Sequence, residues 1–335
     1  MEFKKIQEYI GNMSQVFSVK EYFLSNGKAR GVHAVDICNN TGLELTLLPA
    51  KGLDIYQVRY KGKNLNFLTP NGIVAPQYYN CRGSDWLNCF FGGFLTTCGL
   101  NNIGSECEDN GELLPLHGKI SNTPAENVTV SNILENGFPV VLVRGTIKSA
   151  ALFGGNLSLN RTVKVKFGSN EIELNDVIQN DGYEAKPYMT LYHFNMGYPL
   201  LSEHARLIIP TNKITPRTPH AAQYMERYLE ITPPSVPYEE MCYYHDLKAD
   251  PQGNTAVGIE NPVENLSVQL RFNKNILDHF VQWKMLGKGQ YVMGLEPCNA
   301  TIDGRADARK NGSLKLLNPG ERIEHHLNVL VGECH

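Results

Sequence analysis

Residues 291–300 read YVMGLEPCNA and join an apolar, strand-like run to a carboxylate and a proline. The run Tyr291–Leu295 has the composition of a β-strand, whereas proline supplies no backbone N–H to a sheet. We therefore expect the strand to end at Glu296, with the carboxylate at its mouth. A carboxylate in this apolar setting is poorly solvated, so its proton affinity rises, which suits a general base near neutral pH. A salt-bridged glutamate at a strand end is the alternative interpretation.

The same strand-like pattern recurs along the chain from Ser18 onward. Short apolar or alternating runs are separated by Gly, Asn, Asp and Pro, as is typical of antiparallel strands. Asn136-Gly137 and Asn180-Asp181-Gly182 are hairpin-type turn sequences, and helical periodicity is scarce. The predicted strands are Val32–Cys38, Leu43–Leu48, Ile55–Tyr60, Val128–Leu134, Val140–Ile147, Leu157–Phe167, Ile172–Gln179, Met189–Met196, Ala205–Ile209, Thr255–Glu260, Leu266–Phe272, Tyr291–Leu295 and Ile323–Val331.

The chain of 335 residues is therefore expected to be all-β, with large packed antiparallel sheets. Residues 1–17 are expected to form an N-terminal lead-in and residues 18–335 a single domain. Hydrophobic residues make up 42% and charged residues 19%, which is a globular balance. The Pro-rich segment Thr215–Pro237 is expected to be a long surface excursion, of a kind that often serves function.

Composition also excludes several classes of protein. The net charge is −3 without a basic block, which argues against nucleic-acid binding. Neither a signal peptide nor a run of about 18 apolar residues is present, so we expect no membrane segment. The eight cysteines form no CxxC pair and are expected to be reduced thiols of a cytoplasmic protein, without structural zinc. P-loop, GxGxxG, GxSxG and HExxH motifs are also absent from the sequence.

Two histidine-containing stretches upstream are candidates for the same site as Glu296. Residues 115–124 read PLHGKISNTP, where His117 lies in a loop rich in turn formers and is placed to donate to a ligand oxygen. Residues 189–201 read MTLYHFNMGYPLL, where His193 lies on an apolar strand face and Asn195 shares that face. A histidine there is costly unless it is hydrogen-bonded, so it is either a satisfied core residue or a site residue.

Two further stretches add polar candidates. Residues 241–250 read MCYYHDLKAD and place His245 and Asp246 at the end of an aromatic strand. Aromatic side chains beside polar groups suit sugars, because rings pack on the apolar face of a pyranose while polar groups bind its hydroxyls. Residues 92–100 read GGFLTTCGL, and Asn102 follows them as a further candidate contact. Glycines beside a strand admit either a ligand or another backbone.

Taken in chain order, GGFLTTCGL, PLHGKISNTP, MTLYHFNMGYPLL, MCYYHDLKAD and GLEPCNA resemble the aldose 1-epimerase (galactose mutarotase) superfamily. They are more similar to its branch of bacterial aldose-epimerase-like proteins. The resemblance implies a β-supersandwich with the site on a concave sheet face. Mutarotases also use an arginine before the first histidine, whereas this chain has Asn88 there and Arg82 six residues earlier.

The resemblance also implies residue roles. Glu296 corresponds to the general base, His193 to the general acid and His117 to a second histidine that binds sugar hydroxyls. Asp246 is the preferred position for a sugar-binding aspartate, with His245 as its competitor.

The implied activity is aldose 1-epimerisation of a small-molecule sugar without a cofactor. Glu296 would take the proton of the anomeric hydroxyl while protonated His193 gives one to the ring oxygen. The two groups are then expected to face each other across a sugar ring, farther apart than a hydrogen bond of about 3 Å.

Two alternatives remain open at this point, and one concerns a metal. A metal-dependent sugar isomerase would use His117, His193, His245 and Glu296 as ligands. A non-catalytic carbohydrate-binding protein is the other alternative, since fold does not fix function.

Two basic residues in the last sixth of the chain are candidates for binding a negatively charged group on the sugar. Lys284 lies in FVQWKML and Arg305 in DGRADAR. If the sugar carries a carboxylate, sulfonate or phosphate, a basic side chain is its natural partner. We therefore expect Lys284 or Arg305 in the pocket.

Overall fold

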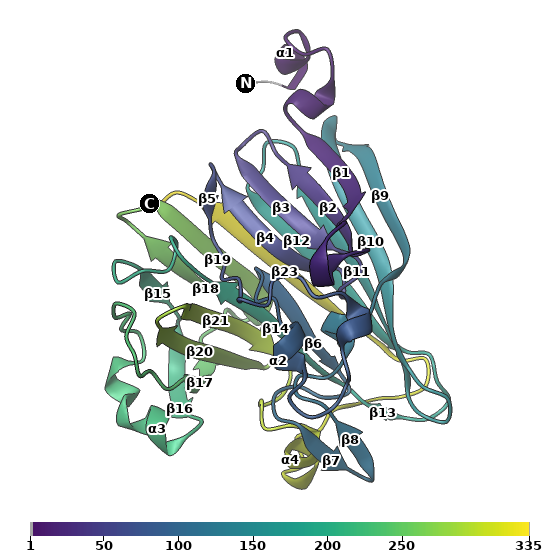
Figure 1. The fold of residues 1–335 in the computed structure, drawn as a ribbon, viewed down its shortest axis with the longest axis vertical. Helices are drawn as coiled ribbons and strands as arrows, with labels where there is room; N and C mark the ends of the chain where they lie inside the picture. Colours follow the sequence, from purple (N-terminus) through teal and green to yellow (C-terminus); the bar gives the residue numbers. More distant parts are fainter. Residues whose placement is uncertain (1–2, 335) are drawn as a thin grey trace.

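The computed structural model describes residues 3–334, which form two large antiparallel sheets (Figure 1). The larger sheet has eleven strands, in the spatial order β1 (Ser18–Phe23), β2 (His33–Cys38), β3 (Leu43–Leu48), β4 (Asp54–Tyr60), β6 (Leu95–Leu100), β14 (Met189–Met196), β21 (Gln290–Cys298), β20 (His279–Gly287), β17 (Met241–Leu247) and β16 (Thr211–Pro216), with β5 (Lys63–Asn64) paired to β4. The second sheet has eight, in the order β15 (Arg206–Ile208), β18 (Asn254–Asn261), β19 (Leu266–Asn273), β23 (Arg322–Gly332), β12 (Glu171–Asn180), β11 (Asn156–Lys166), β10 (Phe138–Ala150) and β9 (Glu126–Glu135).

The remaining elements are short. Two small ribbons pair β7 (Cys107–Asp109) with β8 (Glu112–Leu114) and β13 (Lys186–Pro187) with β22 (Leu316–Leu317). The α-helices are α1 (Phe3–Gln7), α2 (Trp86–Cys89), α3 (Pro219–Gln223) and α4 (Arg305–Lys310). Single 3₁₀ turns occur at Met13–Gln15, Gly27–Ala29, Pro76–Tyr78, Ile120–Asn122 and Met225–Arg227. None of the helices between residues 3 and 334 combines the length and the apolar character needed to cross a membrane.

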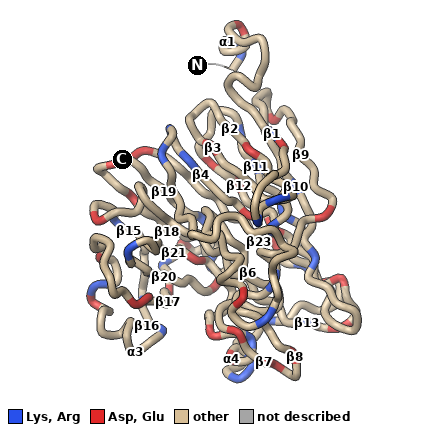
Figure 2. The backbone as a smooth tube through the Cα atoms, in the orientation of Figure 1, with Lys and Arg blue, Asp and Glu red and all other residues tan. Residues whose placement is uncertain are grey.

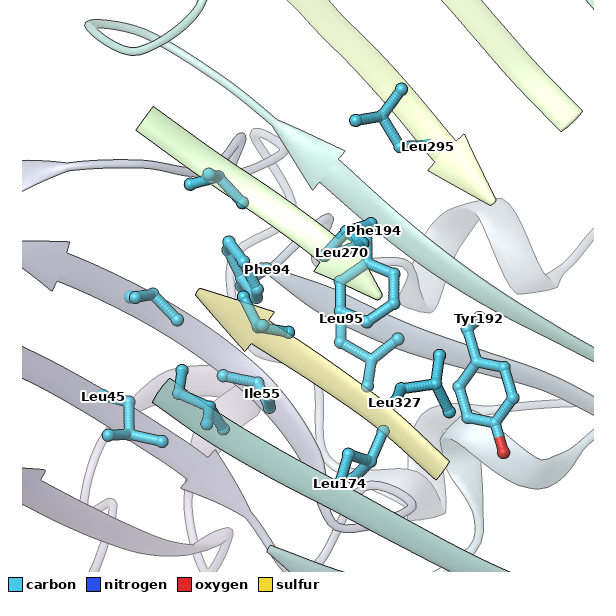
Figure 3. Packing of buried hydrophobic residues seen from close by; sticks show 14 of the residues in the cluster. Leu45, Ile55, Phe94, Leu95, Leu174, Tyr192, Phe194, Leu270, Leu295 and Leu327 are labelled. Atoms are coloured by element: carbon cyan, nitrogen blue, oxygen red, sulfur yellow. The ribbon is translucent and has the colours of Figure 1, made fainter. Parts of the chain in front are cut away.

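The main core lies between the two sheets. Strand alternation turns Leu95, Phe194 and Leu295 of the larger sheet toward Leu174 and Leu327 of the smaller one, and all five are buried (Figure 3). Each buried side chain of this size contributes roughly 1.5–3 kcal/mol. The opposite faces of β6, β14 and β21 are therefore free to carry other side chains.

A buried ionic network crosses this core. Arg161 on β11 pairs with Asp54 at 2.7 Å and with Asp176 at 2.7 Å, and all three side chains are inaccessible to solvent. The Tyr192 hydroxyl donates to Asp176 at 2.7 Å, and the Thr97 hydroxyl donates to Asp54 at 2.6 Å. Because Thr97 and Tyr192 lie on β6 and β14, the network joins the smaller sheet to the middle of the larger one.

The predicted all-β fold is confirmed, and a strand of the structure overlaps each of the predicted runs. The prediction that the last of the site strands ends at Glu296 is wrong, because β21 continues to Cys298 and Pro297 pairs with Phe280. On its other side, the ladder with β14 is interrupted at this point: Leu191 pairs with Cys298 and Phe194 with Leu295, without ladder pairs at the two positions between. Pro297 has no N–H, and it lies where the ladder is open.

Charged side chains are dispersed over the molecule. Figure 2 shows Lys and Arg interspersed with Asp and Glu along the backbone, without a long stripe of one sign in that view. This distribution accords with a net charge of −3. The long segment between β16 and β17 carries α3 and lies at the edge of the larger sheet (Figure 1).

Candidate active site

A cavity of about 630 Å³ lies on the face of the larger sheet that is turned away from the smaller sheet. Successive strand residues point to opposite faces, so Glu296 lines the cavity while Leu295 beside it belongs to the core. The hairpin β20–β21 supplies Trp283, Met285, Gln290, Val292 and Glu296, β14 supplies His193, and β17 supplies Cys242. Helix α2 supplies Trp86 and Leu87, and loops supply Phe67, Thr69, Pro70, Asn71, Phe90, Gly104, Ser105, Leu116, His117, Arg217, Glu240 and Ile302.

His193 and Glu296 meet at the interruption of the β14–β21 ladder. Their Nε2 and Oε1 atoms are 3.4 Å apart, and the residues are 5% and 2% exposed. His193 Nδ1 and Glu296 Oε1 are buried without a hydrogen-bond partner among the described residues. Buried polar atoms are nearly always hydrogen-bonded, so two orphaned atoms beside a cavity point to a ligand that satisfies them.

The expected separation of these two groups by a whole sugar ring is wrong. A gap of 3.4 Å between Nε2 and Oε1 leaves no room for a ring. The physical reason is that the two residues face each other across adjacent strands where the β14–β21 ladder is open, and Gly294 leaves room for the carboxylate.

Gly294 makes room for the carboxylate. It precedes Glu296 by two residues on the same strand face, and a Cβ built there would lie 2.2 Å from Glu296 Oε1. The same Cβ would lie 2.9 Å from Trp283 Cβ. The carboxylate thus occupies space that a side chain at position 294 would otherwise fill, which explains the glycine in the GLE sequence.

Burial decides where the proton of the pair resides. Desolvation raises the pKa of Glu296 well above its ordinary value, and the carboxylate of Glu240 raises it further. Desolvation lowers the pKa of His193 to about 4. Both shifts favour a carboxylic acid beside a neutral imidazole, so the carboxyl has a proton to donate and the imidazole has a nitrogen that can accept one.

His117 forms one wall of the same cavity. The Gly104 N–H donates to its Nδ1 at 3.3 Å, so the ring hydrogen of the neutral imidazole is on Nε2 and is available to a ligand oxygen. Burial lowers the pKa of His117 well below its ordinary value, which keeps the ring neutral. Its backbone has φ 56°, an uncommon conformation outside glycine, and such residues concentrate at functional sites.

Aromatic side chains form the other walls. Trp86 stacks on Phe90 with ring centroids 4.3 Å apart and lies 4.5 Å from the His117 ring. Trp283 meets His193 edge-on at 5.2 Å. The chain has two tryptophans, and both line this cavity. Flat apolar walls around a few polar groups are typical of a site that binds a sugar ring.

A buried lysine anchors the cavity wall that carries Trp86. Lys51 Nζ donates to the backbone carbonyls of Val74 at 3.0 Å and Cys89 at 3.2 Å, and also to the side chain of Asn122. Cys89 is the last residue of α2, the short helix that begins with Trp86. Lys51 thus fixes the aromatic wall of the cavity to the sheet.

Arg217 and Glu240, the flanks of the long segment between β16 and β17, reach the cavity and were not predicted from the sequence. Arg217 Nε donates to Asp303 at 2.9 Å and Nη2 to the Ser105 hydroxyl at 2.9 Å. The Trp283 indole N–H donates to Glu240 at 2.8 Å. The sequence did contain one signal for these two residues, the long Pro-rich segment between the two strands. Long loops in compact folds are often functional, and the two ends of this one lie beside neighbouring strands.

Several predicted sugar contacts lie elsewhere. Asp246 points to solvent, with its side chain 55% exposed, and pairs with Lys274 at 2.8 Å. His245 is on the opposite face of β17 and hydrogen-bonds Gln282. Asn195 shares the face of His193, but the backbone carbonyls of Gly92 and Gly93 accept from its amide and cover it. These placements correct the assignment of Asp246, His245 and Asn195 as cavity residues.

The remaining predicted contacts are also corrected. Asn102 holds its own loop by donating to the carbonyls of Ser105 and Pro115. Lys284 is buried on the opposite face of β20, where its Nζ donates to the Arg227 carbonyl at 3.0 Å. Arg305 is buried in ion pairs with Asp109 and Glu112 at 2.6 Å each. Neither of the two basic residues predicted for an acidic sugar lines the cavity.

The metal-dependent alternative requires ligands that the structure separates. His245 lies on the face of the sheet opposite to His193 and Glu296, so the four proposed ligands do not converge. Within residues 3–334, no group of three or more His, Cys, Asp and Glu side chains is arranged to hold a metal ion.

Comparison with solved structures identifies the fold. A protein of Klebsiella pneumoniae subsp. pneumoniae, described as a candidate aldose 1-epimerase, matches with a TM-score of 0.89 at 25% identity, over 95% of this chain and 84% of that one. A galactose mutarotase-like protein of Clostridium acetobutylicum matches with a TM-score of 0.64 at 13% identity, over 96% and 100%. A galactose 1-epimerase of Lactobacillus acidophilus matches with a TM-score of 0.59 at 13% identity, over 95% and 100%. These likenesses establish the galactose mutarotase-like fold.

Sequence comparison adds the family. No curated protein matches the sequence. The family model described as "Domain of unknown function (DUF4432)" matches residues 29–331, which is most of the chain. The protein therefore belongs to the DUF4432 family and has the galactose mutarotase-like fold.

Proposed function

We propose that this protein is an aldose 1-epimerase, an isomerase that interconverts the anomers of a sugar without a cofactor. The observation that carries the proposal is the His193–Glu296 pair, which is buried in an aromatic-lined cavity with Nε2 and Oε1 3.4 Å apart. His193 Nδ1 and Glu296 Oε1 have no hydrogen-bond partner among the described residues. Anomer exchange requires one acid and one base at neighbouring oxygens, and this pair offers both.

The pair works by exchanging one proton for another at the anomeric centre. During ring opening, the imidazole of His193 accepts the proton of the anomeric hydroxyl while Glu296 donates its proton to the ring oxygen, and the C1–ring oxygen bond breaks. The open aldehyde rotates about its C1–C2 bond. Ring closure reverses both transfers on the other face of C1, so the pair returns to its starting state.

Each residue of the pair therefore acts in both roles: Glu296 is the acid and His193 the base in ring opening, and the roles are exchanged in ring closure. The resting proton lies on Glu296, because burial disfavours both the carboxylate and the imidazolium. After ring opening the two groups carry opposite charges at close range, and the low-dielectric cavity strengthens their attraction. This revises the simpler scheme in which Glu296 starts as the base and a protonated His193 as the acid.

Other cavity residues position the sugar. His117 offers its Nε2 hydrogen to a hydroxyl oxygen, and Arg217 brings a guanidinium to the same cavity. Trp86 and Trp283 supply flat surfaces for the apolar face of the ring. Free thiols at all eight cysteines favour a reducing compartment, so we place the reaction in the cytoplasm.

The test is anomer exchange followed by NMR on a panel of neutral and acidic aldoses. We expect acceleration for at least one sugar and a loss on the order of 10²–10⁴ in Glu296→Gln, which removes the titrating carboxyl and keeps its shape. Glu126→Gln on the surface strand β9 is the matched control and should retain full activity. Absence of acceleration for every sugar would overturn the proposal, and sugar binding without turnover would favour a carbohydrate-binding protein.

A further inference from the structure

The cavity extends well beyond the acid–base pair along the β20–β21 hairpin. Glu296, Val292 and Gln290 all line it, and they lie on one face of β21. Six residues separate Gln290 from Glu296, which corresponds to about 20 Å at the rise of an antiparallel strand. A pyranose ring, built from bonds near 1.5 Å, is roughly 3 Å across, or about 5–6 Å with its hydroxyl oxygens. One sugar ring at the pair therefore leaves most of this length unfilled.

A second wall runs opposite the outer part of the hairpin. The Phe67 N–H donates to the Asn195 carbonyl at 3.0 Å, and Asn195 pairs with Gly294. Phe67 is thereby held at the level of Gly294, two residues outward from Glu296, and Pro70 continues the same wall. The loop is rigidly attached, because the Thr69 hydroxyl donates to the Phe90 carbonyl at 2.6 Å.

The outer part presents mainly apolar surface with polar groups at its rim. Phe67 and Pro70 line one side, and Met285 and Val292 line the other. Gln290 is exposed at the hairpin turn, where its amide is accessible to a bound molecule. Apolar side walls with polar groups at the open end suit the two faces and the hydroxyl edge of a sugar ring.

We infer that this outer part is a subsite for a second sugar unit, so that the substrate is the reducing end of an oligosaccharide. The inference rests on the proposed function, because that function places the anomeric carbon at His193 and Glu296. Anomer exchange needs a free hydroxyl at C1, so a further unit must be attached at another position of the ring. The elongated cavity accepts such a unit along the hairpin, away from the pair.

The first measurement compares glucose with maltose and cellobiose as probes. Binding is followed by the fluorescence of the two tryptophans, which both line the cavity, and turnover by NMR anomer exchange. We expect the disaccharides to show a Kd and a KM about tenfold or more below those of glucose, with a similar kcat, because the second ring adds contacts far from the reacting centre.

The second measurement uses variants at the hairpin. Met285→Ala removes part of the outer wall and should raise the disaccharide KM about tenfold, a larger increase than for the KM of glucose, which does not reach the outer part. Lys288→Ala, an exposed change at the same turn outside the cavity lining, is the control and should change neither substrate.

The outcomes separate the two proposals. Equal affinity for glucose and the disaccharides, or an equal effect of Met285→Ala on both, overturns the second subsite. Tighter disaccharide binding without any turnover supports the subsite and overturns the epimerase function instead.

Discussion

Replacing Gly294 by alanine should disable the acid–base pair while leaving the sheet intact. The new Cβ would lie 2.2 Å from Glu296 Oε1, whereas ordinary contacts begin at 3.4 Å, so the carboxylate must move by the difference of about 1.2 Å. A misplacement of about 1 Å at a reacting group costs on the order of 100-fold in rate. We therefore expect kcat for anomer exchange to fall about 100-fold.

The same substitution should have a smaller effect on stability. The carboxylate oxygen is the free end of a flexible side chain and can rotate away, whereas Trp283 Cβ at 2.9 Å must shift by a few tenths of an ångström. Crowding of this kind costs typically 1–3 kcal/mol, and we expect a loss within that range because Trp283 Cβ is fixed to the β20 backbone. The sheet should therefore still fold at ambient temperature.

The assay measures NMR anomer exchange and thermal unfolding on the same preparations. Gly332→Ala on β23 is the matched control, because its added Cβ meets Ser267 Oγ at an ordinary 3.5 Å. It should retain full activity. Undiminished activity in Gly294→Ala would refute the reasoning, and so would a loss of activity that merely follows a loss of folded protein.

Three further predictions concern pH and the buried charges. Because His193 has a pKa of about 4, kcat/KM should persist at pH 5 and fall only toward pH 4, and an inflection near 6.5 would contradict the proposed resting state. The pKa is about 4 in the folded protein and about 6.5 in the unfolded chain for each of three buried histidines, His193, His245 and His325. The unfolded chain therefore binds more protons between these two pH values. The free energy of unfolding should reach its maximum above pH 6.5 and fall by about 3 kcal/mol for each residue as the pH drops to 4. Urea unfolding at several pH values measures this, and His245→Gln should flatten the slope, whereas an unchanged slope would count against it. Arg161→Met leaves Asp176 buried without its partner and should cost about 3–5 kcal/mol in the same assay, and a loss below about 1 kcal/mol would show that the pair is not stabilising.

The strands of this protein could be predicted because their signal is local. Runs such as Val140–Ile147 and Ile172–Gln179 alternate or stay apolar over one strand length, and turn residues bound them. The strand end at Glu296 was mispredicted because a proline is tolerated where a ladder is open. That opening is a relation between β14 and β21, which the sequence of either strand does not contain.

The residues of the candidate site also differ in whether the sequence alone could identify them. Glu296, His193 and His117 could be singled out because each is a polar residue in an apolar or turn-rich stretch, and the fold brings them to one cavity. Lys284 follows Trp283 directly, so strand alternation sends it to the other face of the sheet. Which of the two faces carries the cavity depends on how the two sheets pack.

By itself the sequence determined an all-β chain, the span of most strands and three polar residues worth following. Only the tertiary structure decided that His193 and Glu296 touch, that Gly294 makes room for the carboxylate, and that Arg217 enters the cavity from a segment far along the chain. The physical reason is that strand propensity is a property of neighbouring residues. Burial, pKa and proximity arise from contacts between strands distant in sequence, and those exist only once the sheets have formed.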